Sequence, residues 1–274
     1  MEFFFRKLFL VGAIAISTNH ANGQELFVFT EPASNMPAKS IGIRIGNWIM
    51  EDQRNSSINY HLIPELMWGV NRRLMIHVEG FASNRNKSFS AEGGALYVKY
   101  RFFSKDRVYR HFRMAALGRI AVNNSDIHQD EIETNGHNSG FEGGIIATQL
   151  LHKQAISATI SYEQATNNAG GNEFPQLQAN KAINYALSTG RLVLPKDYTD
   201  YGQMNLNVMV ELLGQYLPEN RKTYLDATVS MQFIFNSQFR VDVGYKRELY
   251  NNMLRTAPNG FLIRIEHLLF NTFK

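Results

Sequence analysis

The chain repeatedly alternates apolar and polar residues, and this pattern limits its fold more than any other feature. In residues 111–122, HFRMAALGRIAV, the even positions are apolar or small, while the odd positions include His111, Arg113 and Arg119. Side chains on a β-strand point to opposite faces in turn, whereas a helix would scatter these charges around its axis. The stretch therefore predicts a strand with one apolar face and one hydrated face.

The same alternation recurs along most of the chain. Blocks of roughly ten residues, each with one apolar face, add up to about twelve predicted strands. These strands cover residues 40–51, 57–70, 72–83, 91–103, 108–123, 139–152, 154–166, 182–195, 201–217, 223–236, 238–251 and 259–273. The alternation slips at residues 188–191, which predicts a β-bulge there.

The connections between these strands alternate in length. Long connections lie at residues 51–57, 83–90, 124–138, 167–181 and 252–258, with 218–222 as a short exception. Outer-membrane barrels have an even number of strands, short periplasmic turns and longer outer loops. The sequence therefore predicts an all-β fold, a transmembrane antiparallel up-and-down β-barrel.

Aromatic residues indicate which face of the barrel meets lipid. Near the short turns, the apolar faces carry Trp68, Tyr100, Phe102, Phe112, Phe233, Phe235 and Phe239; near the long loops they carry Tyr60, Tyr162 and Phe261. Two aromatic girdles are typical of a lipid-facing band, whereas a soluble β-sandwich has no reason to sort aromatic residues to both ends. We therefore expect the apolar faces to meet lipid and the charged faces to line the lumen.

The N-terminus has the layout of a secretory signal peptide. Basic residues precede an apolar run at residues 8–16, and the small residues Ala21 and Gly23 place cleavage before Gln24. That run is shorter than the roughly 18 residues that a membrane-spanning helix needs. The predicted organisation is a signal peptide at 1–23, a periplasmic N-terminal segment at 24–39 and a barrel at 40–274. The expected location is the cell outer membrane of a Gram-negative bacterium.

Composition excludes several other classes of protein. The chain has no cysteine, which excludes a disulfide framework and a lipoprotein anchor. Its net charge of +4 is spread along the chain, without a basic helix or finger spacing, so nucleic acid is not an expected partner. The expected partners are the lipid bilayer, the barrel-assembly machinery and a small solute or metal ion, and no cofactor is expected.

Residues 28–44, VFTEPASNMPAKSIGIR, carry a family resemblance. They resemble the mature N-terminus of a group of Bacteroidota outer-membrane β-barrel proteins, with the specific match at residues 29–38. The group is broadly similar to outer-membrane transporters of the phenol-degradation (meta-pathway) type, so the resemblance implies a transport barrel, with a link to metal handling in some members. Pro32 and Pro37 exclude a regular helix or central strand, so this block either caps the periplasmic mouth or enters the lumen.

Hairpin 58–83 is the first candidate site. A three-residue turn at 70–72 sets Glu65 opposite His77, and a slip by two residues sets His61 opposite Glu79. Either register gathers His61, Glu65, His77 and Glu79 on one lumenal patch, where imidazoles and carboxylates are suitable ligands for zinc or copper. The alternative is that these four side chains belong to a lumenal ion-pair network.

The acidic loop 123–139 is a second place where cations would collect.

The predicted lumen also carries opposite charges on the two halves of the chain. The candidate lumen and selectivity residues are Arg44, Lys99, Arg101, Arg113, Arg119, Glu211, Asp226, Asp242 and Glu266. A basic first half facing an acidic second half produces either a field across a narrow pore or ion pairs that fill the lumen. The second arrangement is the one that we expect.

These features favour a channel or transporter for a small polar solute or ion. One alternative is a closed structural or adhesive barrel that binds a partner through its outer loops. A barrel hydrolase is a third interpretation, but the sequence has no Gly-x-Ser-x-Gly motif and no histidine–serine pair on an apolar face. We therefore predict a protein that is not an enzyme.

Overall fold

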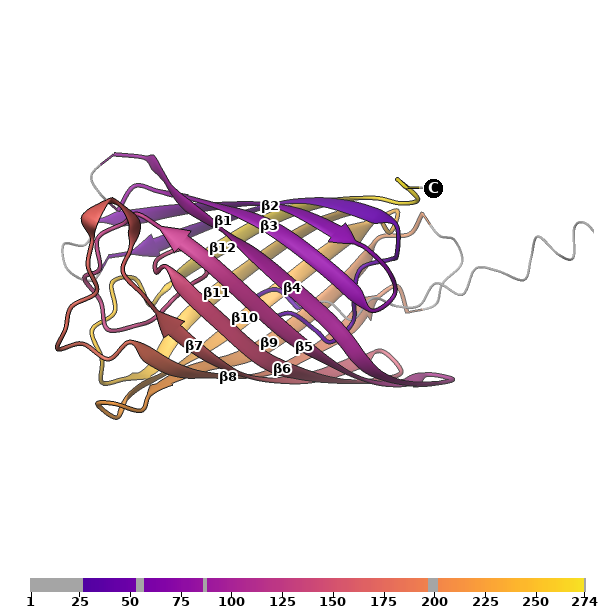
Figure 1. The fold of residues 1–274 in the computed structure, drawn as a ribbon. Helices are drawn as coiled ribbons and strands as arrows, with labels where there is room; N and C mark the ends of the chain where they lie inside the picture. The colour runs from indigo at the N-terminus through magenta and orange to yellow at the C-terminus, as the bar shows by residue number, and fades with distance from the viewer. Residues whose placement is uncertain (1–26, 53–56, 86–87, 197–201, 274) are drawn as a thin grey trace, which may run out of the picture.

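Twelve antiparallel strands close into a barrel in which each strand pairs with its neighbours in sequence and β1 pairs with β12 (Figure 1). The computed structural model describes residues 27–52, 57–85, 88–196 and 202–273. The predicted fold class is confirmed. The predicted signal peptide at 1–23 and its cleavage site before Gln24 lie outside the described residues.

The strand boundaries follow the predicted blocks closely. The strands are β1 (Ser40–Glu51), β2 (Ile58–Gly69), β3 (Leu74–Ser83), β4 (Ser90–Arg107), β5 (Arg110–Asn123), β6 (Gly140–Leu151), β7 (Gln154–Ala165), β8 (Lys181–Leu194), β9 (Asn205–Leu217), β10 (Lys222–Phe235), β11 (Phe239–Asn251) and β12 (Gly260–Leu269). β12 ends at Leu269 rather than at 273, and β4 continues beyond 103 because a bulge between Arg101 and Phe103 lets pairing run on to Arg107. The bulge predicted at 188–191 lies instead between Leu192 and Leu194.

The outer surface of the barrel is apolar, and the interior is polar. Ile120, Val78 and Ile160 are each more than half exposed, as expected of side chains that meet lipid. Trp68 and Tyr100 near the turns, and Tyr162 and Phe261 near the loops, are also exposed on the outside. The lipid-facing assignment from the sequence therefore agrees with the fold. Among the described residues, no helix is long and apolar enough to cross a membrane.

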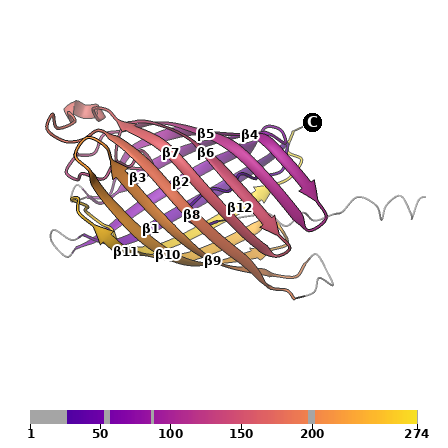
Figure 2. The ribbon, with the colours of Figure 1, turned by 90° about the horizontal axis from the view of Figure 1, so that it is seen from below.

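The long connections gather at one end of the barrel, and the short turns and the C-terminus lie at the other (Figure 2). The loops join β1 to β2, β3 to β4, β5 to β6, β7 to β8, β9 to β10 and β11 to β12. The β7–β8 loop contains a short 3₁₀ turn, η1 (Ala169–Gly171). The predicted alternation of turns and loops is therefore observed except between β8 and β9, where the predicted short turn is a connection that spans residues 195–204 because β9 begins at Asn205 and not at 201.

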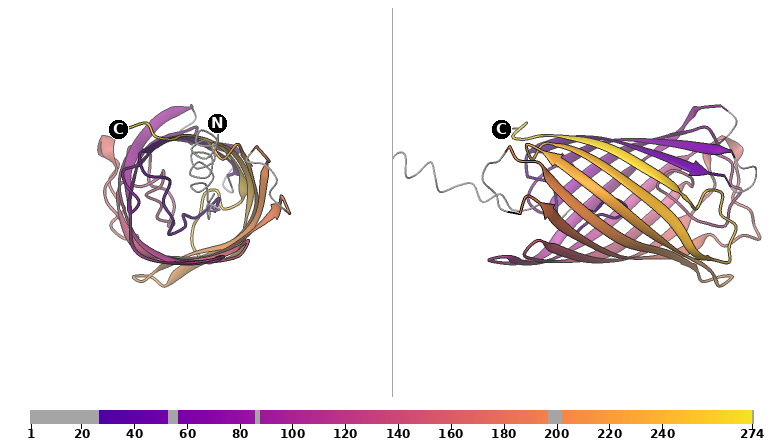
Figure 3. Two further views of the ribbon diagram at one scale, coloured as in Figure 1. Left: turned by 90° about the vertical axis from the view of Figure 1, so that its right-hand side faces the viewer. Right: turned by 180° about the vertical axis from the view of Figure 1, so that it is seen from behind.

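The described residues before β1, from Phe27 on, lie inside the barrel. A view along the barrel axis shows this part of the chain within the ring of strands (Figure 3, left). Its residues 27–37, which we call the lumen segment, have no regular secondary structure, as Pro32 and Pro37 require. The chain leaves the lumen segment at the turn end of the barrel, where the N–H of Lys39 donates to the carbonyl of Gly69. The described part of the predicted 24–39 segment thus enters the lumen instead of capping its mouth.

Candidate functional site: the occluded lumen

Glu211 on β9 holds the lumen segment through its backbone. One carboxylate oxygen accepts the N–H groups of Val28 at 3.1 Å and Phe29 at 2.8 Å, and the other accepts the N–H of Thr30 at 3.0 Å. The second oxygen also accepts the hydroxyls of Thr30 at 2.6 Å and Ser188 at 2.9 Å. Hydrogen bonds to an ionised carboxylate are among the stronger ones in proteins. Glu211, predicted as a selectivity residue, is therefore the principal backbone anchor of the segment.

The predicted basic wall faces the lumen segment. Lys99 Nζ lies 3.0 Å from Glu31 Oε2 and donates to the carbonyl of Pro32 at 2.8 Å. Arg44 Nη1 lies 3.1 Å from Glu31 Oε1. Lys99 is 0% exposed, so hydrogen bonds to Glu31 and Pro32 replace the water that would otherwise solvate its ammonium group. The carboxylate of Glu31 thus neutralises cations that would otherwise face an open lumen.

Two further arginines bind the same segment from opposite walls. Arg113 on β5 donates to the hydroxyl of Ser34 at 2.8 Å. Arg264 on β12 donates to the carbonyls of Val28 at 2.9 Å and Phe27 at 3.1 Å. The segment is therefore fastened to several strands around the barrel.

The loop between β5 and β6 fills the lumen from the other end. Ile132 exchanges two hydrogen bonds with the side chain of Gln215, at 3.0 and 2.7 Å. Arg255, from the β11–β12 loop, is bidentate to Glu131, at 2.9 and 3.0 Å. Burial disfavours the charge of Glu131, but the charge and hydrogen bonds of Arg255 outweigh it and lower the pKa of Glu131 to about 2. These contacts assign the acidic side chain of Glu131 to an internal ion pair.

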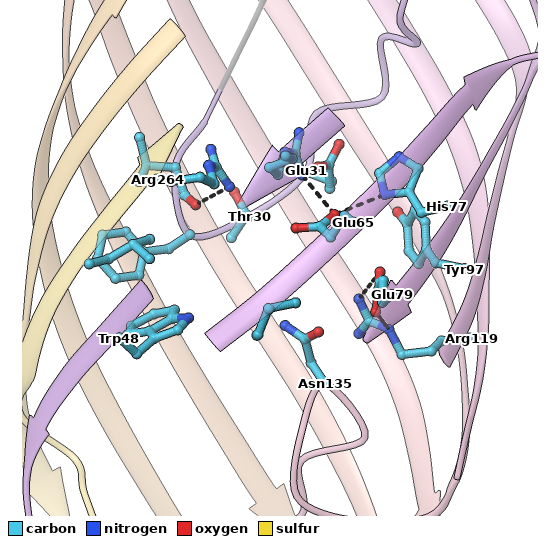
Figure 4. A pocket seen from close by; sticks show the side chains of 15 residues that line it. Thr30, Glu31, Trp48, Glu65, His77, Glu79, Tyr97, Arg119, Asn135 and Arg264 are labelled. Carbon is cyan, nitrogen blue, oxygen red and sulfur yellow. Dashed lines mark hydrogen bonds and ion pairs between the residues drawn. The ribbon is translucent and has the colours of Figure 1, made fainter. Parts of the chain in front are cut away.

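A cavity of about 100 Å³ remains between the lumen segment and this loop (Figure 4). Thr30 and Glu31 line it on the segment side, and Asn135 lines it on the loop side. The barrel wall contributes the other lining side chains: Arg44, Trp48, Ile63, Glu65, His77, Glu79, Tyr97, Arg119, Leu262 and Arg264. The described lumen is thus occluded from both ends around a small polar chamber.

The predicted register of the β2–β3 hairpin was wrong. Glu65 pairs with Glu79, and Met67 pairs with His77, a pairing that neither predicted register contains. The turn is longer than the three residues assumed, because Asn71 Oδ1 accepts the N–H groups of Arg73 and Leu74 at 2.8 and 3.0 Å. With this Asx-type turn four residues, 70–73, lie between the two strands, and the pairing is shifted by two residues from the predicted Glu65–His77 register.

Three of the four predicted metal ligands lie together. Ligand atoms of Glu65, His77 and Glu79 are within 4.8 Å of one another. His61 lies apart from them: its ring packs on Phe81 at 6.3 Å between centroids and lies against Gly136 of the β5–β6 loop. The predicted patch therefore contains a three-residue cluster and a separate histidine, and metal binding by it stays a prediction.

Each carboxylate of the cluster has a basic partner. Arg44 Nη1 lies 3.3 Å from Glu65, and His77 Nδ1 lies 3.3 Å from the same carboxylate. Arg119 lies 3.4 Å from Glu79 and 3.0 Å from Glu142. The ion-pair network that the sequence offered as an alternative to a metal site is therefore present.

The remaining selectivity candidates are paired locally. Asp226 binds Arg255 at 2.7 Å, and Asp242 binds Arg264 at 2.8 Å. Glu266 lies 2.7 Å from Arg44, its direct cross-strand partner, because closure places β12 beside β1. Of these pairs, only Arg44 with Glu266 joins the two predicted walls, whereas Asp226 and Asp242 bind arginines of their own half of the chain.

Arg101 lies near the turn end. It donates to the backbone carbonyl of Arg72 in the β2–β3 turn, at 2.6 Å. Of the predicted charges, this one therefore contacts the hairpin turn rather than the central chamber.

Sequence reasoning missed several residues of the chamber. Glu31 and Thr30 were read as part of a family signature, and Tyr97 was only an alternating residue of its strand. Arg255, which does not line the chamber, lies in a predicted loop, where no pattern indicates a buried guanidinium. The available signal was the excess of lumenal cations in the first half of the chain, for which Glu31 is a partner.

Comparison with solved structures places the fold among outer-membrane barrels. An outer membrane channel from Pseudomonas putida F1 is similar, with a TM-score of 0.55 and 10% identity over 88% of this chain and 99% of that chain. The NanC porin has a TM-score of 0.48 and 10% identity over 84% and 98% of the two chains. No family model and no curated protein matches the sequence. The Bacteroidota resemblance of residues 29–38 stays a prediction.

Proposed function

We propose that this protein is an outer-membrane channel for a small polar solute or ion, and that the described state is its closed state. One observation carries the proposal: the lumen is occluded by two chain segments, not by side chains of the wall alone. The lumen segment and the β5–β6 loop are held by hydrogen bonds and ion pairs, for example Glu211 to Thr30 and Arg255 to Glu131. Neither segment is a strand of the closed sheet, so either can be displaced without breaking the barrel.

Two further features support this function. The interior is polar while the outer face is apolar, as a water-filled passage through a membrane needs. The fold is shared with a protein named as an outer membrane channel. The same fold also suits the closed structural or adhesive barrel, so the function depends on whether the lumen opens.

Conductance in planar bilayers tests the proposal. We expect near-zero current from the intact protein and single-channel currents from a variant that lacks residues 27–37 and has the tip of the loop, residues 132–137, replaced by glycine and serine. Each change alone serves as a control, because each leaves one occluding segment in place. Folding of every variant is checked by heat-modifiable mobility in electrophoresis. A well-folded double variant that never conducts would indicate the closed structural barrel.

Metal binding is a second candidate function, favoured by one observation. Glu65 and Glu79 are directly opposed across the β2–β3 pair, and ligand atoms of these two carboxylates and of His77 lie within 4.8 Å of one another. Zinc added to metal-free protein is expected to bind with a stoichiometry of one, and His77→Gln is expected to weaken this binding. His61→Gln is the matched control because His61 lies outside the cluster. Equal zinc affinity in both variants would exclude the site.

A further inference from the structure

Glu31 presents a carboxylate to a site made by the barrel wall. Its two oxygens face different cations, Oε1 to Arg44 at 3.1 Å and Oε2 to Lys99 at 3.0 Å. Both hydrogen-bond partners of Lys99 within the described residues belong to the lumen segment, namely Glu31 and the carbonyl of Pro32. Removal of the segment would therefore leave a buried ammonium without an anion, which is strongly unfavourable.

Two residues that line the same chamber as this carboxylate have hydrogen-bonding atoms without a partner in the described part of the chain. The hydroxyl of Tyr97 and Nε2 of His77 are buried and have no hydrogen-bond partner within the described residues. Their rings are 5.1 Å apart, and both side chains line the chamber that Glu31 lines (Figure 4). A phenol O–H is a donor to an anion, whereas the ring nitrogen of His77 that faces Glu65 is Nδ1, which leaves Nε2 of a neutral imidazole as an acceptor. The wall thus offers two cations and one further donor, the hydroxyl of Tyr97, to a carboxylate in this chamber.

We propose that this site binds the carboxylate of a small monocarboxylic acid, which competes with Glu31 for Lys99 and Arg44. The proposal deepens the channel function by naming the class of solute, and it rests on that function for its physiological meaning. The short apolar part of the acid fits the chamber beside Ile63 and Leu262, within about 100 Å³. A second carboxylate would face Glu65 and Glu79, so the site disfavours diacids.

Equilibrium binding of propionate tests the site without requiring transport. The full mature protein is titrated in detergent by calorimetry, as wild type and as Glu31→Gln, which keeps the shape of the side chain and removes its charge. The matched control is Glu173→Gln, since Glu173 is exposed in the β7–β8 loop. Propionamide, which has nearly the same shape and no charge, is the ligand control.

We expect Glu31→Gln to bind propionate about tenfold or more tightly than wild type, because its internal competitor has lost the charge that makes such hydrogen bonds strong. Glu173→Gln is expected to match wild type, and propionamide is expected not to bind. Adding Lys99→Gln to Glu31→Gln removes the cation and is expected to abolish the gain. Should that double variant not fold, Tyr97→Phe in the Glu31→Gln background, which removes one donor, is expected to weaken binding severalfold.

Two outcomes would overturn the site: equal propionate affinity in Glu31→Gln and wild type, or equal affinity for propionamide. Failure of the channel function has a different signature. Current through the double variant described above without propionate binding would reject the carboxylate site and keep the channel. Propionate binding without any current would support the site and reject the channel.

Discussion

The hydroxyl of Thr30 lies 2.6 Å from a carboxylate oxygen of Glu211, although 181 residues separate them in the chain. The contact joins a segment that precedes the first strand to the inner face of the ninth. Together with the three N–H groups that Glu211 accepts, it makes one carboxylate responsible for the position of residues 28–30.

Replacing Glu211 by Gln is therefore expected to loosen the lumen segment. The amide keeps one acceptor oxygen but loses the charge, and each hydrogen bond to a charged group contributes about 1.5–3 kcal/mol. Amide hydrogen exchange at residues 28–30 is expected to become at least about tenfold faster, since 1.4 kcal/mol corresponds to one factor of ten. Glu219→Gln, at an exposed loop position, is the control. Unchanged exchange in Glu211→Gln would mean that other contacts hold the segment.

Replacing Gly136 by Ala is expected to release the β5–β6 loop from the lumen. Gly136 has φ of 126°, and an added Cβ would lie 2.1 Å from the His61 ring. Both the backbone conformation and the contact therefore oppose a side chain. Protease that cuts after glutamate is expected to cleave Gly136→Ala at Glu131 or Glu133 while sparing wild type. Gly143→Ala, where an added Cβ meets nothing within 4 Å, is expected to remain uncut.

The ion pair of Glu131 with Arg255 is expected to lose its stabilising effect in acid. The folded protein lowers the pKa of Glu131 to about 2, below its ordinary value of 4.5. A lowered carboxyl pKa gives stability that is complete above pH 4.5 and is lost as the pH falls through 2. The measurement is urea unfolding of wild type and Glu131→Gln. Their difference is expected to be about 1–3 kcal/mol at pH 6 and to shrink toward pH 2. A difference that is constant with pH would contradict this account.

The outward face of β4 gives a prediction about membrane insertion. Val98 lies between the exposed residues Leu96 and Tyr100 and pairs with Ile76 and Gly118. Arginine at a lipid-facing site near the bilayer centre costs about 2–4 kcal/mol. Val98→Arg is therefore expected to fold into lipid vesicles with a lower free energy of unfolding than wild type. Val108→Arg, in the β4–β5 turn where Val108 is 82% exposed, is the control and is expected to have little effect.

The barrel was predictable from sequence because its physics is local. Alternation with period two sorts each side chain to lipid or lumen, and it places Ile120 outward and Arg119 inward without any knowledge of neighbours. Register was less accessible, since one hydrogen-bonding side chain in a turn, Asn71, moves every pair of the β2–β3 hairpin. A shift of this size keeps each side chain on its face, so the alternation contains no trace of it.

The chamber was harder to predict because its partners are remote in the chain. Glu31 with Lys99 and Arg255 with Glu131 depend on where irregular segments turn, and no periodicity governs such segments. The lumenal charges were identified individually, but their pairing needed the closure of β12 on β1, which makes Arg44 and Glu266 neighbours. Pro32 and Pro37 exclude a regular strand in the N-terminal block, but they do not indicate whether the block caps the periplasmic mouth or enters the lumen.

Arg264 on β12, which donates to the carbonyls of Val28 and Phe27, also makes the receptor of the lumen segment depend on the last strand. Residues 27 and 28 are among the first described residues to be synthesised, yet their binding partners Glu211 and Arg264 are made much later. The lumen segment therefore has no complete receptor until the last strand exists. Although this segment precedes every strand, it completes its contacts only with the last one.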